Sequence, residues 1–291
     1  MTPEPIGSEK VADSASAAQA TTQSTAPVPI PSVTITAEVA KAVAQAPEEP
    51  GNLTKLVLSP LGSRPRKCPE VVPAWWRLVS THDSVTGLFD TLHLVRRTRA
   101  EKTTTKTTRG RLHSDAQDLL RAAIVFTSAG LDAAVQALIH HAVPTLIALP
   151  GTPRSKYETF IDEQVRAPKT GEDFLLALKA QDPRAELLGL YLQSKTKASF
   201  QGSSDLRSRA GSSLGITNQQ IPKRRFDALD PFFTARNDVA HRLDMEGFEL
   251  GGAKPPKKIR IQQDVLHMCD QALILVRDLI TKTAVNLADH R

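Results

Sequence analysis

The sequence predicts an all-α protein, a compact helical bundle that follows a disordered N-terminal tail. Aromatic residues make up only 4% of the 291 residues, whereas alanine and leucine, both strong helix formers, are plentiful. Two long stretches, 113–147 and about 262–287, carry apolar residues at the spacing of one helix face. Together these observations favour helices over a β-sandwich.

The N-terminal part of the chain has the composition of a disordered segment. Residues 1–50 are dominated by Ala, Ser, Thr, Pro, Glu and Gln and contain no aromatic residue. Such a segment cannot bury enough apolar surface to offset the entropy lost on ordering, so we expect a disordered tail, either plain or a tether for a partner. Residues 51–79 remain rich in proline and predict an irregular arm. The helical domain is expected over residues 80–291.

Net charge and cysteine content limit the classes of protein to which this chain can belong. The formal net charge is +6, which permits an acidic partner such as nucleic acid without demanding one. Cys68 and Cys269 are far apart and predict neither a disulfide framework nor a zinc site. There is no signal-peptide pattern, and no stretch approaches the ~20 apolar residues of a membrane span. We therefore expect a cytoplasmic protein that does not associate with a membrane.

The stretch 113–147 carries the strongest helical pattern of the chain. Gly130 lies in its middle and predicts either a close approach of a second helix or a kink. Pro144 predicts a bend or an end of the helix. Short helices separated by glycine and proline follow over residues 151–200, and a last long helix is expected from about residue 262 to about residue 287.

Three basic stretches are candidates for contacting phosphate groups. Residues 96–111 and 254–260 are rich in lysine and arginine, and residues 96–111 are equally compatible with an ordinary solvated loop. Lys223, Arg224 and Arg225 lie on a short helix just before the stretch that we single out below, and Arg242 lies at its end. We expect these four residues to bind RNA.

The stretch Arg236-Asn237-Asp238-Val239-Ala240-His241 combines a cation, an amide and an imidazole on one predicted helix. Histidine exchanges protons near neutral pH, and the guanidinium group matches phosphate oxygens. Such a pair suits RNA cleavage without metal: a base takes the 2′-OH proton, the oxygen attacks phosphorus, and arginine stabilises the developing charge. Alternatively, Arg236 pairs with Asp230 or Asp238 and the stretch is only structural.

The spacing within this stretch favours a site built from two chains. Arg236 and His241 are five residues apart, about 140° around a helix, so they do not share a face well, whereas Asn237 and His241 do. A second copy of the helix across a two-fold axis would bring both residue types into one cleft. Elsewhere the sequence has no phosphate-binding loop after a strand, no nucleophile elbow and no zinc-ligand spacing, so we expect no metal and no cofactor.

The Arg236–His241 stretch resembles the Arg-(four to six residues)-His motif of the HEPN superfamily, in which a polar residue follows the arginine. Residues 119–125, followed by 128–132, resemble the first core helix of RiboL-PSP-type HEPN domains, and residues 214–216 and 229–230 follow in the family's order. The resemblance covers residues 80–288 in outline and implies a compact all-α domain that dimerises. Many such domains are metal-independent ribonucleases in toxin–antitoxin or antiviral defence systems, while others are inactive binding or assembly modules.

The resemblance implies that Arg236 and His241 are catalytic, with Asn237 as the accessory polar residue and Asp132 as a further site residue. It implies a homodimeric endoribonuclease that leaves 2′,3′-cyclic phosphate ends on its RNA, with an inhibitory partner protein as a further expectation. The family's tyrosine two residues after the histidine is replaced by Leu243, so regulation through that tyrosine is not expected. The alternatives are a non-catalytic assembly module and a basic helical nucleic-acid-binding protein.

Overall fold

The computed structural model describes residues 53–102, 112–168, 171–247 and 255–289. These residues belong to one unit of the chain, Glu49–Arg291, and the predicted tail of residues 1–50 lies outside the described ranges. The described residues are mostly helical and contain no β-strand, which confirms the all-α class. The helices follow one another as η1 (Pro69–Val71), α2 (Val72–Lys102), α3 (Ser114–Ala148), α4 (Thr152–Arg166), α5 (Glu172–Lys179), α6 (Pro183–Thr196), α7 (Ser203–Leu206), η2 (Arg207–Gly211, a π-helical turn), α8 (Lys223–Asp227), α9 (Asp230–Arg242) and α10 (Gln262–Ala288).

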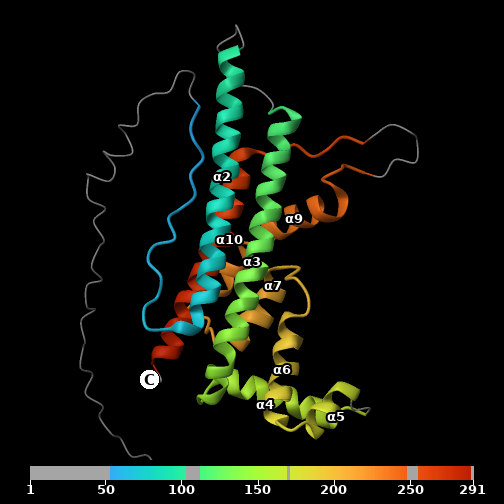
Figure 1. Cartoon of the computed structure of the whole chain (residues 1–291). Coiled ribbons are helices and arrows are strands. Elements are labelled where there is room, and N and C mark those ends of the chain that lie inside the picture. Colours follow the sequence, from blue (N-terminus) through green and yellow to red (C-terminus); the bar gives the residue numbers. More distant parts are fainter. Residues whose placement is uncertain (1–52, 103–111, 169–170, 248–254, 290–291) are drawn as a thin grey trace, which may run out of the picture. The chain divides into compact units, whose positions relative to one another are not determined.

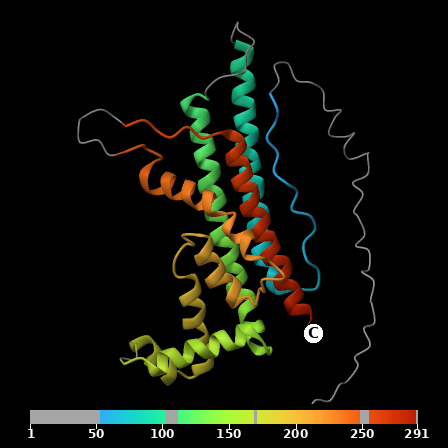
Figure 2. The same cartoon turned by 180° about the vertical axis from the view of Figure 1, so that it is seen from behind.

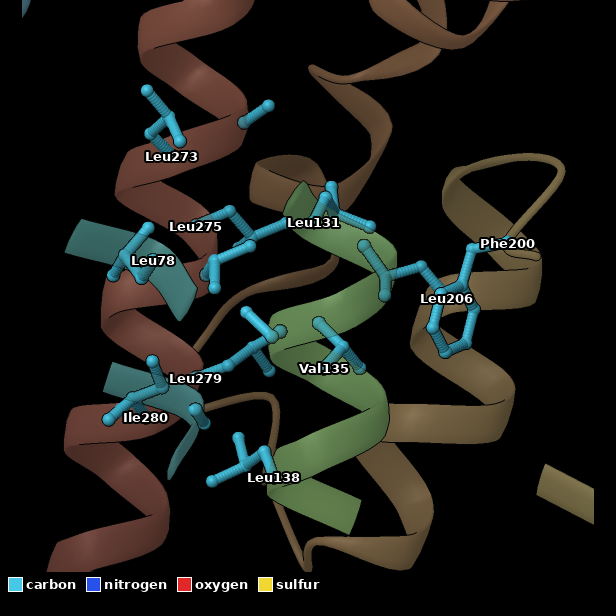
Figure 3. Packing of buried hydrophobic residues seen from close by; sticks show 14 of the residues in the cluster. Leu78, Leu131, Val135, Leu138, Phe200, Leu206, Leu273, Leu275, Leu279 and Ile280 are labelled. Atoms are coloured by element: carbon cyan, nitrogen blue, oxygen red, sulfur yellow. The ribbon is translucent and has the colours of Figure 1, made fainter. Parts of the chain in front are cut away.

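Three long helices, α2, α3 and α10, pack side by side and form the body of the fold (Figure 1). Their facing sides supply most of the buried apolar residues, and the same arrangement is seen from behind (Figure 2). In the close view, Leu78 of α2 and Leu279 of α10 lie on one side of α3, while Phe200 and Leu206 lie on its other side (Figure 3). The middle of α3 is therefore the centre of the core.

The predicted arm of residues 51–79 is shorter in the structure, because α2 begins at Val72. Pro73, which suggested irregular structure, is the second residue of this helix. There a missing backbone N–H costs nothing, since the first N–H groups of a helix have no partner within it. The turn η1 precedes α2, residues 53–68 before it have no regular secondary structure, and the backbone N–H of Ser59 donates to Asp270 of α10 over 2.7 Å.

Helix α3 continues through Pro144 to Ala148, so the helix does not end at this proline. Val143 and Leu146 are buried in the core on either side of it, and this packing maintains the helix. The basic stretch 96–111 divides in a similar way: residues up to Lys102 belong to α2, and residues 103–111 lie outside the described ranges.

Helix α3 is also long and apolar enough to cross a membrane, judged by length and composition alone, although the sequence suggested no such segment. In the structure, 56% of its most apolar window is buried. The core of a helical bundle requires the same composition in its central helix.

Gly130 marks a close approach of α2 to α3, one of the two outcomes that its position in the sequence suggested. A Cβ atom at this position would lie 2.0 Å from Oγ1 of Thr81, whose hydroxyl donates to the carbonyl oxygen of Arg77. Threonine is branched at Cβ and cannot swing away easily. The absence of a side chain at Gly130 therefore sets the distance between the two helices.

Gly130→Ala is expected to lower the free energy of unfolding by about 1–3 kcal/mol, because the two helices must separate to admit the methyl group. Gly87→Ala is the matched control, since Gly87 lies in α2 with no atom near the place of a new Cβ. The control is expected to raise stability by about 0.5–1 kcal/mol through helix propensity. Chemical denaturation measures both changes, and equal effects would contradict the assigned close approach.

Candidate functional site

Helix α9 carries the Arg-Asn-His stretch and rests against the N-terminal half of α3 (Figure 1). Leu229 precedes the helix, and Pro231 occupies the first turn, where proline is tolerated. Phe232, Phe233, Ala235 and Val239 are buried on its inner face. This orientation brings the neighbouring position, Arg236, to the edge of the contact with α3.

Arg236 is half-buried and held by three neutral oxygen atoms. Its Nε donates to Oγ of Ser128 on α3 over 3.2 Å, and its Nη1 donates to Oδ1 of Asn237 over 2.9 Å and to Oε1 of Gln201 over 3.3 Å. Among the described residues, no carboxylate forms an ion pair with Arg236. The guanidinium is thus fixed in direction while its charge remains available to an anion.

The acidic partners expected for a purely structural Arg236 are engaged elsewhere. Asp230 accepts a hydrogen bond from the hydroxyl of Ser203. Asp238 binds Lys258, and this contact, more than the opposing effect of burial, holds the pKa of Asp238 below its usual range. Neither carboxylate is therefore the partner of Arg236.

Asp132 lies one turn beyond Ser128 on α3, near Arg236. Its Oδ1 accepts the backbone N–H of Phe200 over 2.9 Å. Burial raises the pKa of Asp132, while the N–H of Phe200 and the charge of Arg236 act in the opposite direction. Because Phe200 immediately precedes Gln201, the carboxylate fixes the loop that presents Gln201 to Arg236.

Arg209 fixes the same loop from its other side, a role that the sequence did not reveal. Its guanidinium donates to the carbonyl oxygens of Lys195 and Ala198, over 2.7 and 2.6 Å, and to the carboxylate of Asp205 over 2.9 Å. It also stacks 4.4 Å above the ring of Phe200. The loop is therefore tied to α3 and to η2.

His241 is exposed in the last turn of α9 and does not contact Arg236 through any hydrogen bond in the described part of the chain. Arg236 is directed towards α3, whereas His241 is open to solvent, as the angle of about 140° between them requires. Asn237 lies one turn before His241, and its side-chain oxygen accepts a hydrogen bond from Arg236. One chain thus presents the two groups separately.

The turn after His241 is strained and held by a buried carboxylate. Leu243 and Asp244 have φ angles of 50° and 61°, the left-handed region that non-glycine residues rarely adopt. Asp244 is fully buried and accepts from Nε of Arg121 on α3 and Nε of Arg260, each over 3.0 Å. Its carbonyl oxygen accepts the backbone N–H of Lys258 over 2.7 Å. Asp244 therefore ties the end of α9 to α3.

The four predicted RNA-binding residues lie in different surroundings. Lys223 pairs with Asp227 over 2.8 Å, and Arg225 pairs with Asp278 over 2.9 Å. Arg224 is exposed, and Arg242 is exposed with Asp238 3.9 Å away. The exposed cation nearest in sequence to His241 is thus Arg242.

Cofactor chemistry depends on metal-ligating side chains and on thiols. In residues 53–102, 112–168, 171–247 and 255–289, no group of three or more His, Cys, Asp or Glu side chains is placed to hold a metal ion. Both cysteines are buried, and burial raises the pKa of the Cys269 thiol to about 12.

Comparisons with family models, with curated proteins and with solved structures found no match for this chain.

Proposed function

We propose that this protein is a metal-independent endoribonuclease whose catalytic residues are Arg236 and His241, with Asn237 as an accessory. The observation that carries the proposal is the fixed, half-buried guanidinium of Arg236, which three neutral oxygens orient and with which no described carboxylate forms an ion pair. Maintaining an arginine in this way favours binding of an external anion such as phosphate. The resemblance of this stretch to the HEPN motif points to the same chemistry.

In the proposed reaction His241 removes the proton of a ribose 2′-OH. The 2′ oxygen attacks the adjacent phosphorus, the bond from phosphorus to the 5′ oxygen breaks, and a 2′,3′-cyclic phosphate forms. Arg236 stabilises the charge that develops on the phosphate oxygens, and the 5′ oxygen leaves with a proton. Because the nucleophile is the 2′-OH, RNA is the substrate and DNA is not.

The proposed site is composite and formed by a homodimer. Within one chain His241 is exposed and separated from Arg236 by the helix angle, so a second α9 is needed to complete a cleft. The second imidazole is then available to protonate the 5′ oxygen. A defence or toxin role, with an inhibitory partner protein, follows from the resemblance alone.

Incubation of the purified protein with total RNA in the presence of EDTA tests the proposal. Wild-type protein is expected to cleave RNA, and His241→Ala is expected to lower the rate by about 10²–10⁴-fold, the usual contribution of a general base. His141 provides a matched control, since it is also an exposed helical histidine, and His141→Ala should cleave as the wild type does. Equal rates for all three proteins would indicate a contaminating nuclease and refute the proposal.

A further inference from the structure

A pocket of about 680 Å³ lies between the start of α3 and the segment that precedes α10. Its polar lining includes Ser114, Gln117, Asp118, Arg121, Lys257 and Lys258. Leu112 and Ile259 contribute an apolar wall. The volume and the combination of an apolar wall with polar and charged groups suit a small organic ligand with a charged part.

The surroundings of the pocket carry an excess of positive charge. Ion pairs link five cationic side chains to only three carboxylates around it. The cationic residues are Arg121, Arg242, Lys257, Lys258 and Arg260, and the carboxylates are Asp118, Asp238 and Asp244. The two positive charges that remain favour an anionic ligand.

Of the three cations that line the pocket, Lys257 is the one most able to change its partner. Its ammonium lies 3.1 Å from Asp118, and the two side chains are 40% and 53% exposed. An exposed pair of this kind contributes little to stability, so exchanging the carboxylate for a phosphate costs little. Arg121 differs, because it is buried against Asp244 and serves the fold.

The pocket and the proposed catalytic site both lie along α3. Ser128, which holds Arg236, is ten residues after Asp118 on α3, a separation of about 15 Å at 1.5 Å per residue. A stacked strand of nucleic acid advances about 3.4 Å per nucleotide, so about four nucleotides span this distance. Helix α9 bridges the two places, since it is tied to α3 through both Arg236 and Asp244.

We infer that this pocket is a subsite for one nucleotide of the RNA chain, a few nucleotides away from the bond that is cleaved. Lys257 binds its phosphate, and the apolar wall of Leu112 and Ile259 packs against its base. The inference rests on the proposed function for the identity of the polymer. It assigns substrate binding to the end of α9 next to α3, whereas Lys223 and Arg225 are occupied by carboxylates elsewhere.

Binding of a fully 2′-O-methylated hexaribonucleotide tests this inference, because the probe cannot be cleaved and reports binding alone. Lys257→Gln is expected to weaken binding several-fold and to lower the slope of log K against log salt by about 0.7, the value for one contact to a single strand. Ser114→Phe, which fills the pocket without altering charge, is expected to weaken binding and to leave the slope unchanged. Lys55→Gln is the matched control, since Lys55 pairs with Asp90 over 2.9 Å at similar exposure, and it should bind as the wild type does.

The outcomes separate this inference from the proposed function. If Lys257→Gln and Ser114→Phe bind the hexamer as tightly as the wild type, the pocket is not a subsite, even when the protein cleaves RNA. If a free nucleoside monophosphate binds as tightly as the hexamer, the pocket serves a small ligand and the inference fails. If both variants weaken binding while wild-type protein cleaves no RNA in EDTA, the subsite is supported and the nuclease proposal is wrong.

Discussion

Arg236→Ala is expected to lower the rate of RNA cleavage by about 10²–10³-fold, the usual cost of removing one donor to the charge of a transition state. The guanidinium is held in place by Ser128, Gln201 and Asn237, and no described carboxylate forms an ion pair with it. Its removal therefore withdraws a charge that is already oriented. Single-turnover cleavage of a defined RNA oligonucleotide measures the change.

A matched control separates this loss from general damage to the protein. Arg277 of α10 is also a partly buried arginine, but it pairs with Asp278 over 2.8 Å. Arg277→Ala is expected to cleave at the wild-type rate. Arg236→Lys keeps a positive charge and loses the fork of donors, so its rate should fall between those of wild type and Arg236→Ala. A wild-type rate for Arg236→Ala would remove this residue from the mechanism.

Asp244→Ala is expected to lower the free energy of unfolding by about 3–5 kcal/mol, the usual cost of breaking a buried ion pair by removing one partner. The substitution leaves Arg121 buried without its carboxylate and releases Arg260. It also removes the contact that holds a left-handed turn at a non-glycine residue. Chemical denaturation followed by circular dichroism measures the change.

Asp162→Ala is the control for this effect. Asp162 also pairs with an arginine, Arg166, but the two side chains are 65% and 80% exposed. Solvent screens such a pair, so the control should change stability by less than about 1 kcal/mol. Asp244→Asn keeps one of the two acceptor oxygens and should lose less stability than Asp244→Ala. Equal losses for Asp162→Ala and Asp244→Ala would show that the buried pair does not support the fold.

The long helices were predictable because their apolar pattern reports burial directly. The last helix was expected from about residue 262 to about residue 287 and is observed as Gln262–Ala288; the central helix was expected over 113–147 and is observed as Ser114–Ala148. Two prolines misled the interpretation of the sequence. Pro73 occupies a harmless first turn and Pro144 is held within a buried helix, and both outcomes depend on surroundings that a local pattern does not contain.

The site was predictable only in part. The sequence singled out Arg236, and the resemblance to HEPN domains added Asp132; in the structure the Asp132 carboxylate on α3 accepts a hydrogen bond from the loop that carries Gln201. The contacts of Arg236 with Ser128 and of Asp244 with Arg121 join residues more than a hundred positions apart, so no spacing rule could reveal them. Gln201 lies in a loop without a regular pattern and Arg209 in the short π-helical turn η2, and both were missed for the same reason.

The chemistry of the cleaved ends tests the central claim most directly. An RNA oligonucleotide that the protein cuts is incubated with it in EDTA, alongside a copy that carries a 2′-O-methyl group on the nucleotide before the cut. The account predicts that the unmodified RNA gives a fragment with a 2′,3′-cyclic phosphate and that the modified copy remains intact. Cleavage of the modified copy, or ends that carry a 3′-hydroxyl, would contradict attack by the 2′-OH at Arg236 and His241.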